Sequence, residues 1–139
     1  MIVIDASVGL KWLRRENEKY IDKALFLLKN HSDNIELITV PSLFYLEIAN
    51  ALVTKSLTKI ETIKEDLSVL NDINLKVDSF TKDDYIEAAL LAKKHKTTVY
   101  DMLYAVIAKK LKTVLITADE KFRQKTKFPF VKLLSEYSD

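Results

Sequence analysis

Short runs of β-branched and aliphatic residues alternate along the chain with longer segments in which apolar residues recur every three or four positions. The short runs predict buried strands, and the longer periodic segments predict amphipathic helices. The expected strands cover residues 2–4, 35–40, 76–79, 113–117 and 130–132. The expected helices cover residues 6–15, 18–30, 41–55, 58–70, 81–95, 100–111 and 119–125. Because strands and helices alternate, we expect an α/β fold with a mainly parallel central sheet and helices on both of its faces.

Capping residues mark several of the expected helix starts. Pro41 is expected in the first turn of a helix, where its fixed φ is favourable. Thr58 and Glu61 have the spacing of a capping box, in which each side chain bonds the backbone N–H of the other residue. Thr81 and Asp84 have the same spacing and predict a cap for the helix over residues 81–95.

The composition narrows both the fold and the chemistry. The chain has 139 residues, 48% hydrophobic and 30% charged, so we expect a single globular domain over residues 1–139. The absence of cysteine excludes disulfides and a thiol nucleophile, and 2 histidines are too few for a histidine-rich metal site. Because the chain has only 1 glycine, Gly-rich phosphate-binding loops are excluded as well.

Charge is distributed unevenly along the chain. Residues 1–92 carry 11 Lys/Arg and 15 Asp/Glu, a net charge of −4, whereas residues 93–139 carry 11 and 5, a net charge of +6. The basic C-terminal part is consistent with a polyanionic partner, although solvated helix surfaces are the simpler explanation. No stretch has the roughly 18 uncharged apolar residues of a membrane span. The first residues also lack the features of a signal peptide, so we expect a cytoplasmic protein that does not enter a membrane.

Some carboxylates occur in segments that otherwise lack charge. Asp5 is the only charged residue among residues 1–10, Glu47 among residues 41–54, and Asp101 among residues 97–108. Solvated helices normally carry a charged face, and no Lys or Arg lies three or four positions from Glu47 or Asp101. An isolated buried carboxylate is costly unless it is paired, protonated or bound to a metal ion.

Two acids lie at the carboxyl ends of expected strands, where parallel sheets form their ligand crevice. Asp5 directly follows the first strand, and Asp119 comes two residues after the strand over residues 113–117. Both acids could instead be plain helix caps, and Asp101 could complement the dipole of its helix. Glu47 lies in the middle of a helix and could be a neutral carboxyl group or the partner of a distant base.

If Asp5, Glu47, Asp101 and Asp119 meet in one crevice, they repel one another. At about 5 Å and an effective dielectric constant of about 20, each like-charged pair costs about 3 kcal/mol. A cation relieves this repulsion, and a donor set made only of oxygens, with Ser7 and Thr117 as hydroxyl supports, favours Mg²⁺ or Mn²⁺ over zinc. Such ions activate water and stabilise the oxygens of a phosphodiester, so the acids indicate phosphodiester hydrolysis.

Four segments carry a distinctive pattern in a fixed order. They are Val3-Ile4-Asp5-Ala6-Ser7 with Leu10-Lys11-Trp12-Leu13, then Pro41-Ser42-Leu43-Phe44-Tyr45-Leu46-Glu47-Ile48-Ala49-Asn50-Ala51-Leu52, then Tyr100-Asp101-Met102-Leu103-Tyr104-Ala105, and finally Leu115-Ile116-Thr117-Ala118-Asp119. Each motif is short, but their order and spacing over essentially the whole chain closely resemble PIN-domain ribonucleases of the VapC toxin family.

The resemblance implies a three-layer α/β/α PIN-like fold and a Mg²⁺- or Mn²⁺-dependent endoribonuclease. It implies metal-site roles for Asp5, Glu47, Asp101 and Asp119, with Thr117 and Ser7 orienting these acids or a metal-bound water. It also implies an RNA substrate, a homodimer, and a small antitoxin protein that occupies the active-site groove in a type II toxin–antitoxin pair. Many relatives have glycine between the helix that carries the Asp101-type acid and the next strand, whereas this chain has Leu111-Lys112-Thr113.

Other functions are compatible with the same residues. The chain could be a catalytically inactive PIN-fold module that binds RNA or protein, or an RNA-processing nuclease without an antitoxin. A phospho-acceptor receiver domain normally has an acidic pair after the first strand, which is absent here. A phosphatase of the haloacid dehalogenase type needs a second Asp two residues after Asp5, where this chain has Ser7.

Overall fold

The computed structural model describes residues 1–14, 16, 18–55 and 58–138. Its strands are β1 (Ile2–Ile4), β2 (Ile38–Pro41), β3 (Lys76–Asp78), β4 (Leu115–Thr117) and β5 (Val131–Leu133). They form a five-stranded sheet in the order β3-β2-β1-β4-β5, and every neighbouring pair is parallel. The expected parallel α/β sheet is confirmed.

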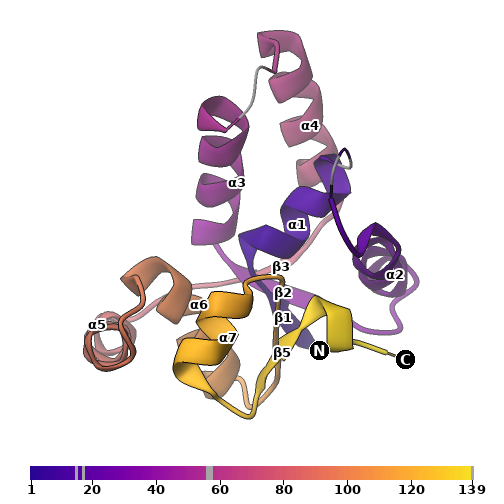
Figure 1. Cartoon of the computed structure of the whole chain (residues 1–139). Coiled ribbons are helices and arrows are strands. Elements are labelled where there is room, and N and C mark those ends of the chain that lie inside the picture. Colours follow the sequence, from indigo (N-terminus) through magenta and orange to yellow (C-terminus); the bar gives the residue numbers. More distant parts are fainter. Residues whose placement is uncertain (15, 17, 56–57, 139) are drawn as a thin grey trace.

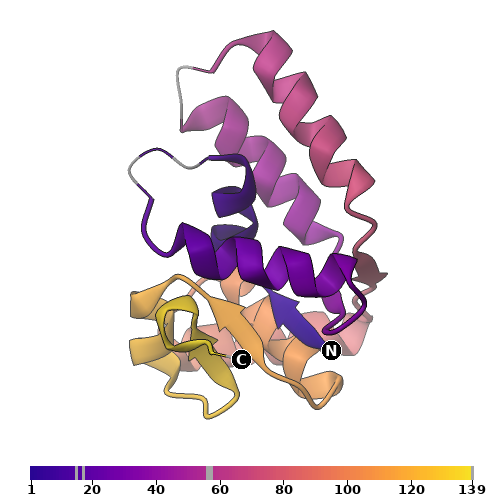
Figure 2. The same ribbon diagram turned by 90° about the vertical axis from the view of Figure 1, so that its right-hand side faces the viewer.

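Helices cover both faces of this sheet. They are α1 (Ala6–Leu13), α2 (Ile21–Ser32), α3 (Leu43–Thr54), α4 (Ile60–Asp72), α5 (Lys82–His95), α6 (Val99–Lys110) and α7 (Glu120–Thr126), followed by the 3₁₀-helix η1 (Leu134–Glu136). After β1 the chain adds β2 and then β3 on one side of β1. It then returns and adds β4 and β5 on the other side of β1. Right-handed crossovers therefore put α1 to α4 on one face and α5 to α7 on the other, which gives the three-layer α/β/α arrangement (Figure 1 and Figure 2). None of the described helices is long and apolar enough to cross a membrane.

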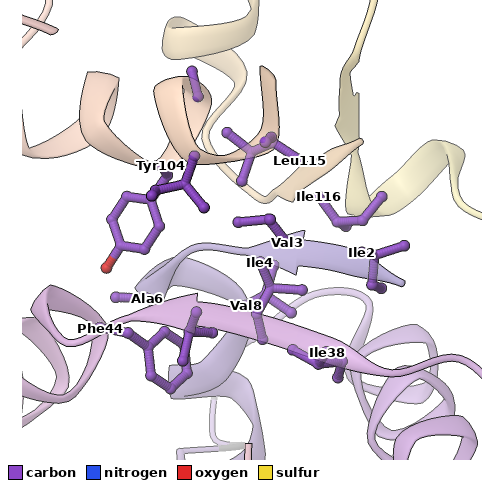
Figure 3. Close-up of a cluster of buried hydrophobic side chains, with 14 of the residues drawn as sticks. Ile2, Val3, Ile4, Ala6, Val8, Ile38, Phe44, Tyr104, Leu115 and Ile116 are labelled. Carbon is purple, nitrogen blue, oxygen red and sulfur yellow. The ribbon is translucent and has the colours of Figure 1, made fainter. Parts of the chain in front are cut away.

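The core is centred on the middle strand, β1, and its neighbour β4. Val3, Ile4, Leu115 and Ile116 are each 0% exposed, as expected for strands covered by helices on both faces. Figure 3 shows aromatic side chains approaching this layer from opposite sides, Phe44 from α3 and Tyr104 from α6. The buried strands hold the loops at their carboxyl ends in place.

The expected helix starts at Pro41 and Thr58 are wrong. Pro41 is the last residue of β2, where it pairs with Asp78 of β3, and α3 begins only at Leu43. A proline is tolerated at a strand end because the missing N–H interrupts no continuing ladder. The N-cap of α4 is Lys59, with no side-chain cap, so the Thr58 capping box does not form.

The capping box of α5 is confirmed. The Thr81 hydroxyl oxygen accepts a bond from the Asp84 N–H at 3.2 Å, and an Asp84 carboxylate oxygen accepts one from the Thr81 N–H at 2.8 Å. A salt bridge of 3.2 Å from Lys110 to Asp84 then joins α6 to α5.

Two other boundaries are displaced. The strand expected over residues 35–40 begins at Ile38. Ile35 is 70% exposed and its N–H bonds the Asn30 carbonyl in the turn after α2, whereas Leu37, 45% exposed, contributes only its carbonyl to the ladder, as acceptor of the Ile2 N–H at 2.9 Å. The helix expected over residues 18–30 begins at Ile21, since Tyr20 adopts a left-handed conformation with φ 60°. Residue 15, expected at the end of the first helix, lies outside the described residues.

Candidate active site

The acids singled out in the sequence gather at the carboxyl end of the sheet, around the ends of β1 and β4. β1 and β4 lie side by side, and the chain leaves them toward opposite faces, so a crevice opens at this point. A cavity of about 210 Å³ lies here. Its described lining residues are Asp5, Ala6, Ser7, Leu10, Glu47, Ala51, Lys55, Asp101, Tyr104 and Asp119. We call it the acid pocket.

Asp5 connects β1 to α1, and two hydroxyl groups hold its carboxylate. The Ser7 hydroxyl donates to Oδ1 at 2.5 Å, and the Thr117 hydroxyl donates to Oδ2. Each hydroxyl oxygen also accepts a backbone N–H, from Ala118 to Ser7 at 2.9 Å and from Asp119 to Thr117 at 3.0 Å. Because those N–H groups are donors, both hydroxyl protons are directed at Asp5.

Thr117 itself is fully buried and does not line the acid pocket. It therefore acts from behind Asp5, whereas Ser7 and Asp5 both face the pocket. Through these bonds, the two hydroxyls also tie the start of α1 to the turn between β4 and α7.

Asp5 and Asp119 are both helix caps as well as pocket residues. Asp5 Oδ1 accepts the Ser7 N–H at 3.1 Å at the start of α1, and Asp119 Oδ1 accepts the Phe122 N–H at 3.0 Å at the start of α7. The capping interpretation is thus correct for both, and it does not exclude a second role. At Asp119 the capping bond leaves the other oxygen able to face the crevice, whereas at Asp5 the other oxygen, Oδ2, also accepts the Thr117 hydroxyl and keeps one lone pair for a ligand.

Glu47 and Asp101 reach the acid pocket from helices on opposite faces of the sheet. Glu47 lies in the middle of α3, and its Oε1 accepts a hydrogen bond of 2.6 Å from the Tyr104 hydroxyl of α6. Asp101 lies in the first turn of α6, where its N–H donates to the Thr98 hydroxyl at 3.1 Å. The absence of a local base beside Glu47 is explained, because its partner is a phenol 57 residues away in sequence.

Electrostatics indicates that negative charge outweighs positive charge in the acid pocket, where Lys55 is the one basic residue among the described lining residues. Burial raises the pKa of Asp5 to about 6, against the opposing effect of the bonds from Ser7 and Thr117, and the Asp101 charge adds to the rise. Burial also raises the pKa of Glu47 and of Asp101, and each of these shifts is increased by a neighbouring carboxylate. Such acids release their protons more readily when a cation arrives.

The chemistry of the four acids suits a hard divalent cation, but their side chains are not arranged around one ion. Their donor atoms are all carboxylate oxygens, as Mg²⁺ and Mn²⁺ prefer. However, no three acidic or histidine side chains among the described residues converge closely enough to hold a metal ion.

Two residues of the acid pocket had no candidate role from the sequence. Tyr104 is 1% exposed yet bonds Glu47, and Lys55, at the end of α3, is the basic residue among the described lining residues. The spacing of Asp101 and Tyr104, three positions apart on one helix face, was the available signal for Tyr104. A similar signal existed for Lys55, which comes eight positions after Glu47 and therefore lies on the same face of the helix, at its C-terminal end.

Known proteins resemble the chain in family pattern and in fold. The model of the PIN domain family matches residues 2–127, whereas no curated protein matches by sequence. Among solved structures, PAE2754 from Pyrobaculum aerophilum has a TM-score of 0.70 at 21% identity, over 96% of this chain and 90% of that chain.

Two further structures share the fold. VapC20 from Mycobacterium tuberculosis, described as a sarcin-ricin loop cleaving toxin, has a TM-score of 0.67 at 12% identity, over 89% of this chain and 94% of that chain. VapBC2 from Rickettsia felis, bound to a DNA fragment from their promoter, has a TM-score of 0.69 at 18% identity, over 96% and 98%. At these identities the structures show the fold alone, and the family match carries the assignment. The resemblance found in the sequence is confirmed: the chain belongs to the PIN domain family, and this membership supports a nuclease activity.

Proposed function

We propose that this protein is a Mg²⁺- or Mn²⁺-dependent endoribonuclease that acts as a single domain over residues 1–139. The observation that carries the proposal is the acid pocket, in which four carboxylates from four separate segments line one crevice of about 210 Å³. Burial and mutual repulsion raise the pKa of three of them, Asp5, Glu47 and Asp101. A purely structural site has no use for four carboxylates beside a single lysine among the described lining residues.

In the proposed mechanism, Asp5, Glu47, Asp101 and Asp119 would hold the cation. A bound divalent ion would supply Lewis-acid activation of water and charge stabilisation at the phosphodiester. Ser7 and Thr117 orient Asp5 and favour its charged form, because both hydroxyls donate to it. Lys55, the basic residue of the pocket lining, would attract the phosphate backbone of the substrate.

The proposed biological role is that of a toxin held by an antitoxin. Support comes from the fold neighbours, which include a sarcin-ricin loop cleaving toxin and a VapBC complex bound to promoter DNA. We therefore propose RNA as the substrate, the cytoplasm as the site of action, and a small antitoxin protein as the partner. We also propose a homodimer, which sedimentation equilibrium of the purified chain tests directly.

The central experiment measures RNA cleavage by the purified chain with Mg²⁺ or Mn²⁺ and with EDTA. We expect cleavage only with the cation, and an Asp5→Asn variant should lose at least roughly 100-fold in rate. The matched control is Asp72→Asn, which changes an exposed acid at the end of α4. Cleavage that survives EDTA or the Asp5→Asn change at the parental rate would overturn the proposal.

Two alternatives predict different results in the same experiment. A binding module without catalysis would retain RNA in a gel-shift assay but cut nothing with either cation. An RNA-processing nuclease without an antitoxin would cut RNA but would not slow growth when expressed alone. Sequencing RNA ends after induced expression separates this alternative from the toxin and identifies the cleaved RNA.

A further inference from the structure

Among the described residues that line the acid pocket, Tyr104 is the core residue with a polar group, its hydroxyl. Tyr104 is 1% exposed, and its ring packs beside β1 while the oxygen points out of the hydrophobic cluster (Figure 3). That hydroxyl donates to Oε1 of Glu47 at 2.6 Å. The bond therefore joins α6, on one face of the sheet, to α3, on the other.

The bond from Tyr104 engages one of the two carboxylate oxygens of Glu47. A phenol has one proton to donate, and it goes to Oε1. No described residue donates a hydrogen bond to the other oxygen, Oε2. A glutamate side chain has three rotatable bonds and loses considerable freedom when it is held in one orientation. Here the hydrogen bond from the Tyr104 phenol already restricts the Glu47 side chain, so this conformational entropy is lost before any ligand binds.

We propose that Tyr104 is a positioning residue of the acid pocket, holding Glu47 by Oε1 so that Oε2 serves as a ligand for a divalent cation. The inference rests on the proposed function, because it assumes that Glu47 holds the cation. Tyr104 is three positions after Asp101 on α6, so the same helix that carries one acid also orients another. The phenol thus couples the positions of acids supplied from opposite faces of the sheet.

The competing explanation is purely structural. A buried phenol needs a hydrogen-bond acceptor whatever its function, and Glu47 would be only the nearest one. In that case, removing the hydroxyl would change the stability of the protein but would leave its affinity for cations unchanged. If Tyr104 positions Glu47, removing the hydroxyl should instead weaken cation binding, because groups that orient a metal ligand typically contribute roughly 10- to 100-fold to metal affinity.

The test is a calorimetric titration of Mn²⁺ into Tyr104→Phe, with Tyr45→Phe as the matched control. Tyr45 lies on α3 against Phe44, with ring centroids 5.5 Å apart, and does not line the acid pocket. We expect Tyr104→Phe to bind Mn²⁺ roughly 10- to 100-fold more weakly and Tyr45→Phe to match the parent. In RNA cleavage assays, the Tyr104→Phe rate should approach the parental rate at saturating Mn²⁺.

Parental Mn²⁺ affinity in a folded Tyr104→Phe variant would overturn the inference and leave the proposed function intact. Failure of the parent itself to bind Mn²⁺ and cut RNA would instead overturn the proposed function. If Tyr104→Phe does not fold, Glu47→Gln keeps the inference testable, because an amide oxygen still accepts the phenol. If Glu47→Gln binds Mn²⁺ as tightly as the parent, Glu47 is not a cation ligand and the inference about Tyr104 is wrong.

Discussion

The only glycine of the chain, Gly9, lies directly against the ring of Phe44. A Cβ atom at Gly9 would come within 2.4 Å of Cζ of Phe44 and 2.9 Å of Cδ1 of Ile48. Gly9 is in the middle of α1 and Phe44 and Ile48 are on α3, so the missing side chain lets the two helices approach closely. This approach brings Asp5, at the start of α1, and Glu47 of α3 to the same pocket.

Gly9→Ala should therefore destabilise the protein, although alanine normally favours a helix interior by about 1 kcal/mol over glycine. The overpacking against the Phe44 ring is expected to exceed that gain, with a net loss of about 1–2 kcal/mol. Urea unfolding of the parent and the variant measures the difference. The double variant Gly9→Ala/Phe44→Leu should recover part of the loss, and a stabilised Gly9→Ala would contradict the close approach.

Asp5→Asn should stabilise the cation-free protein at neutral pH. Burial raises the pKa of Asp5 to about 6 in the folded state, against about 4 in the unfolded chain. The folded state binds this proton more tightly, so the stability contributed by Asp5 is full below pH ~4 and is lost as the pH rises through ~6. Asparagine removes this loss, on the order of 2–3 kcal/mol at most, and remains a good N-cap.

The measurement is denaturant unfolding in EDTA at a pH of about 4 and at neutral pH. Asp5→Asn should gain stability over the parent at neutral pH, and the gain should shrink toward zero at the acidic pH. The exposed Asp72→Asn variant should show no such difference. A gain that is equal at both values would disprove the link to the Asp5 proton.

Lys112→Gly should stabilise the turn between α6 and β4. Lys112 has φ 53°, a left-handed conformation in which a side chain is strained and glycine is not. The expected gain is about 1 kcal/mol, measured as a shift in the thermal midpoint. The same substitution at Lys94, inside α5, should lower stability by about 1 kcal/mol. A loss at Lys112 would mean that its side chain makes a contact that outweighs the strain.

Lys55→Gln should weaken RNA binding in a way that depends on salt. Lys55 lines the acid pocket, and its charge opposes the rise in the pKa of Glu47. If it contacts a phosphate, its loss should reduce the slope of log affinity against log salt by about 0.7. Binding is measured in the Asp5→Asn background to prevent cleavage, with Lys64→Gln on the exposed side of α4 as the control. An unchanged slope would limit Lys55 to balancing the charge of the acids.

Much of the acid pocket was predictable from the sequence because its acids occur in segments that otherwise carry no charge or closely follow buried strands. Glu47 is the single charge of an apolar helix, and Asp5 and Asp119 follow buried strands, so each was out of place before any fold was known. Parallel pairing of β1 with β4 then brings the two strand-end acids together. The Thr81 capping box was equally visible, because capping is a matter of residues three positions apart.

The misplaced boundaries have other origins. Pro41 pairs with Asp78 of β3 and so ends a strand, whereas the Ile35 N–H bonds the Asn30 carbonyl in the turn after α2. The chain by itself determined the order of strands and helices and the unusual setting of its carboxylates, because periodicity and capping act between near neighbours. Only the tertiary structure decided that Tyr104 bonds Glu47 and that helices from opposite faces of the sheet bring Glu47 and Asp101 to one pocket. Those contacts depend on how closely the helices pack across the sheet, and no spacing in the sequence specifies that distance.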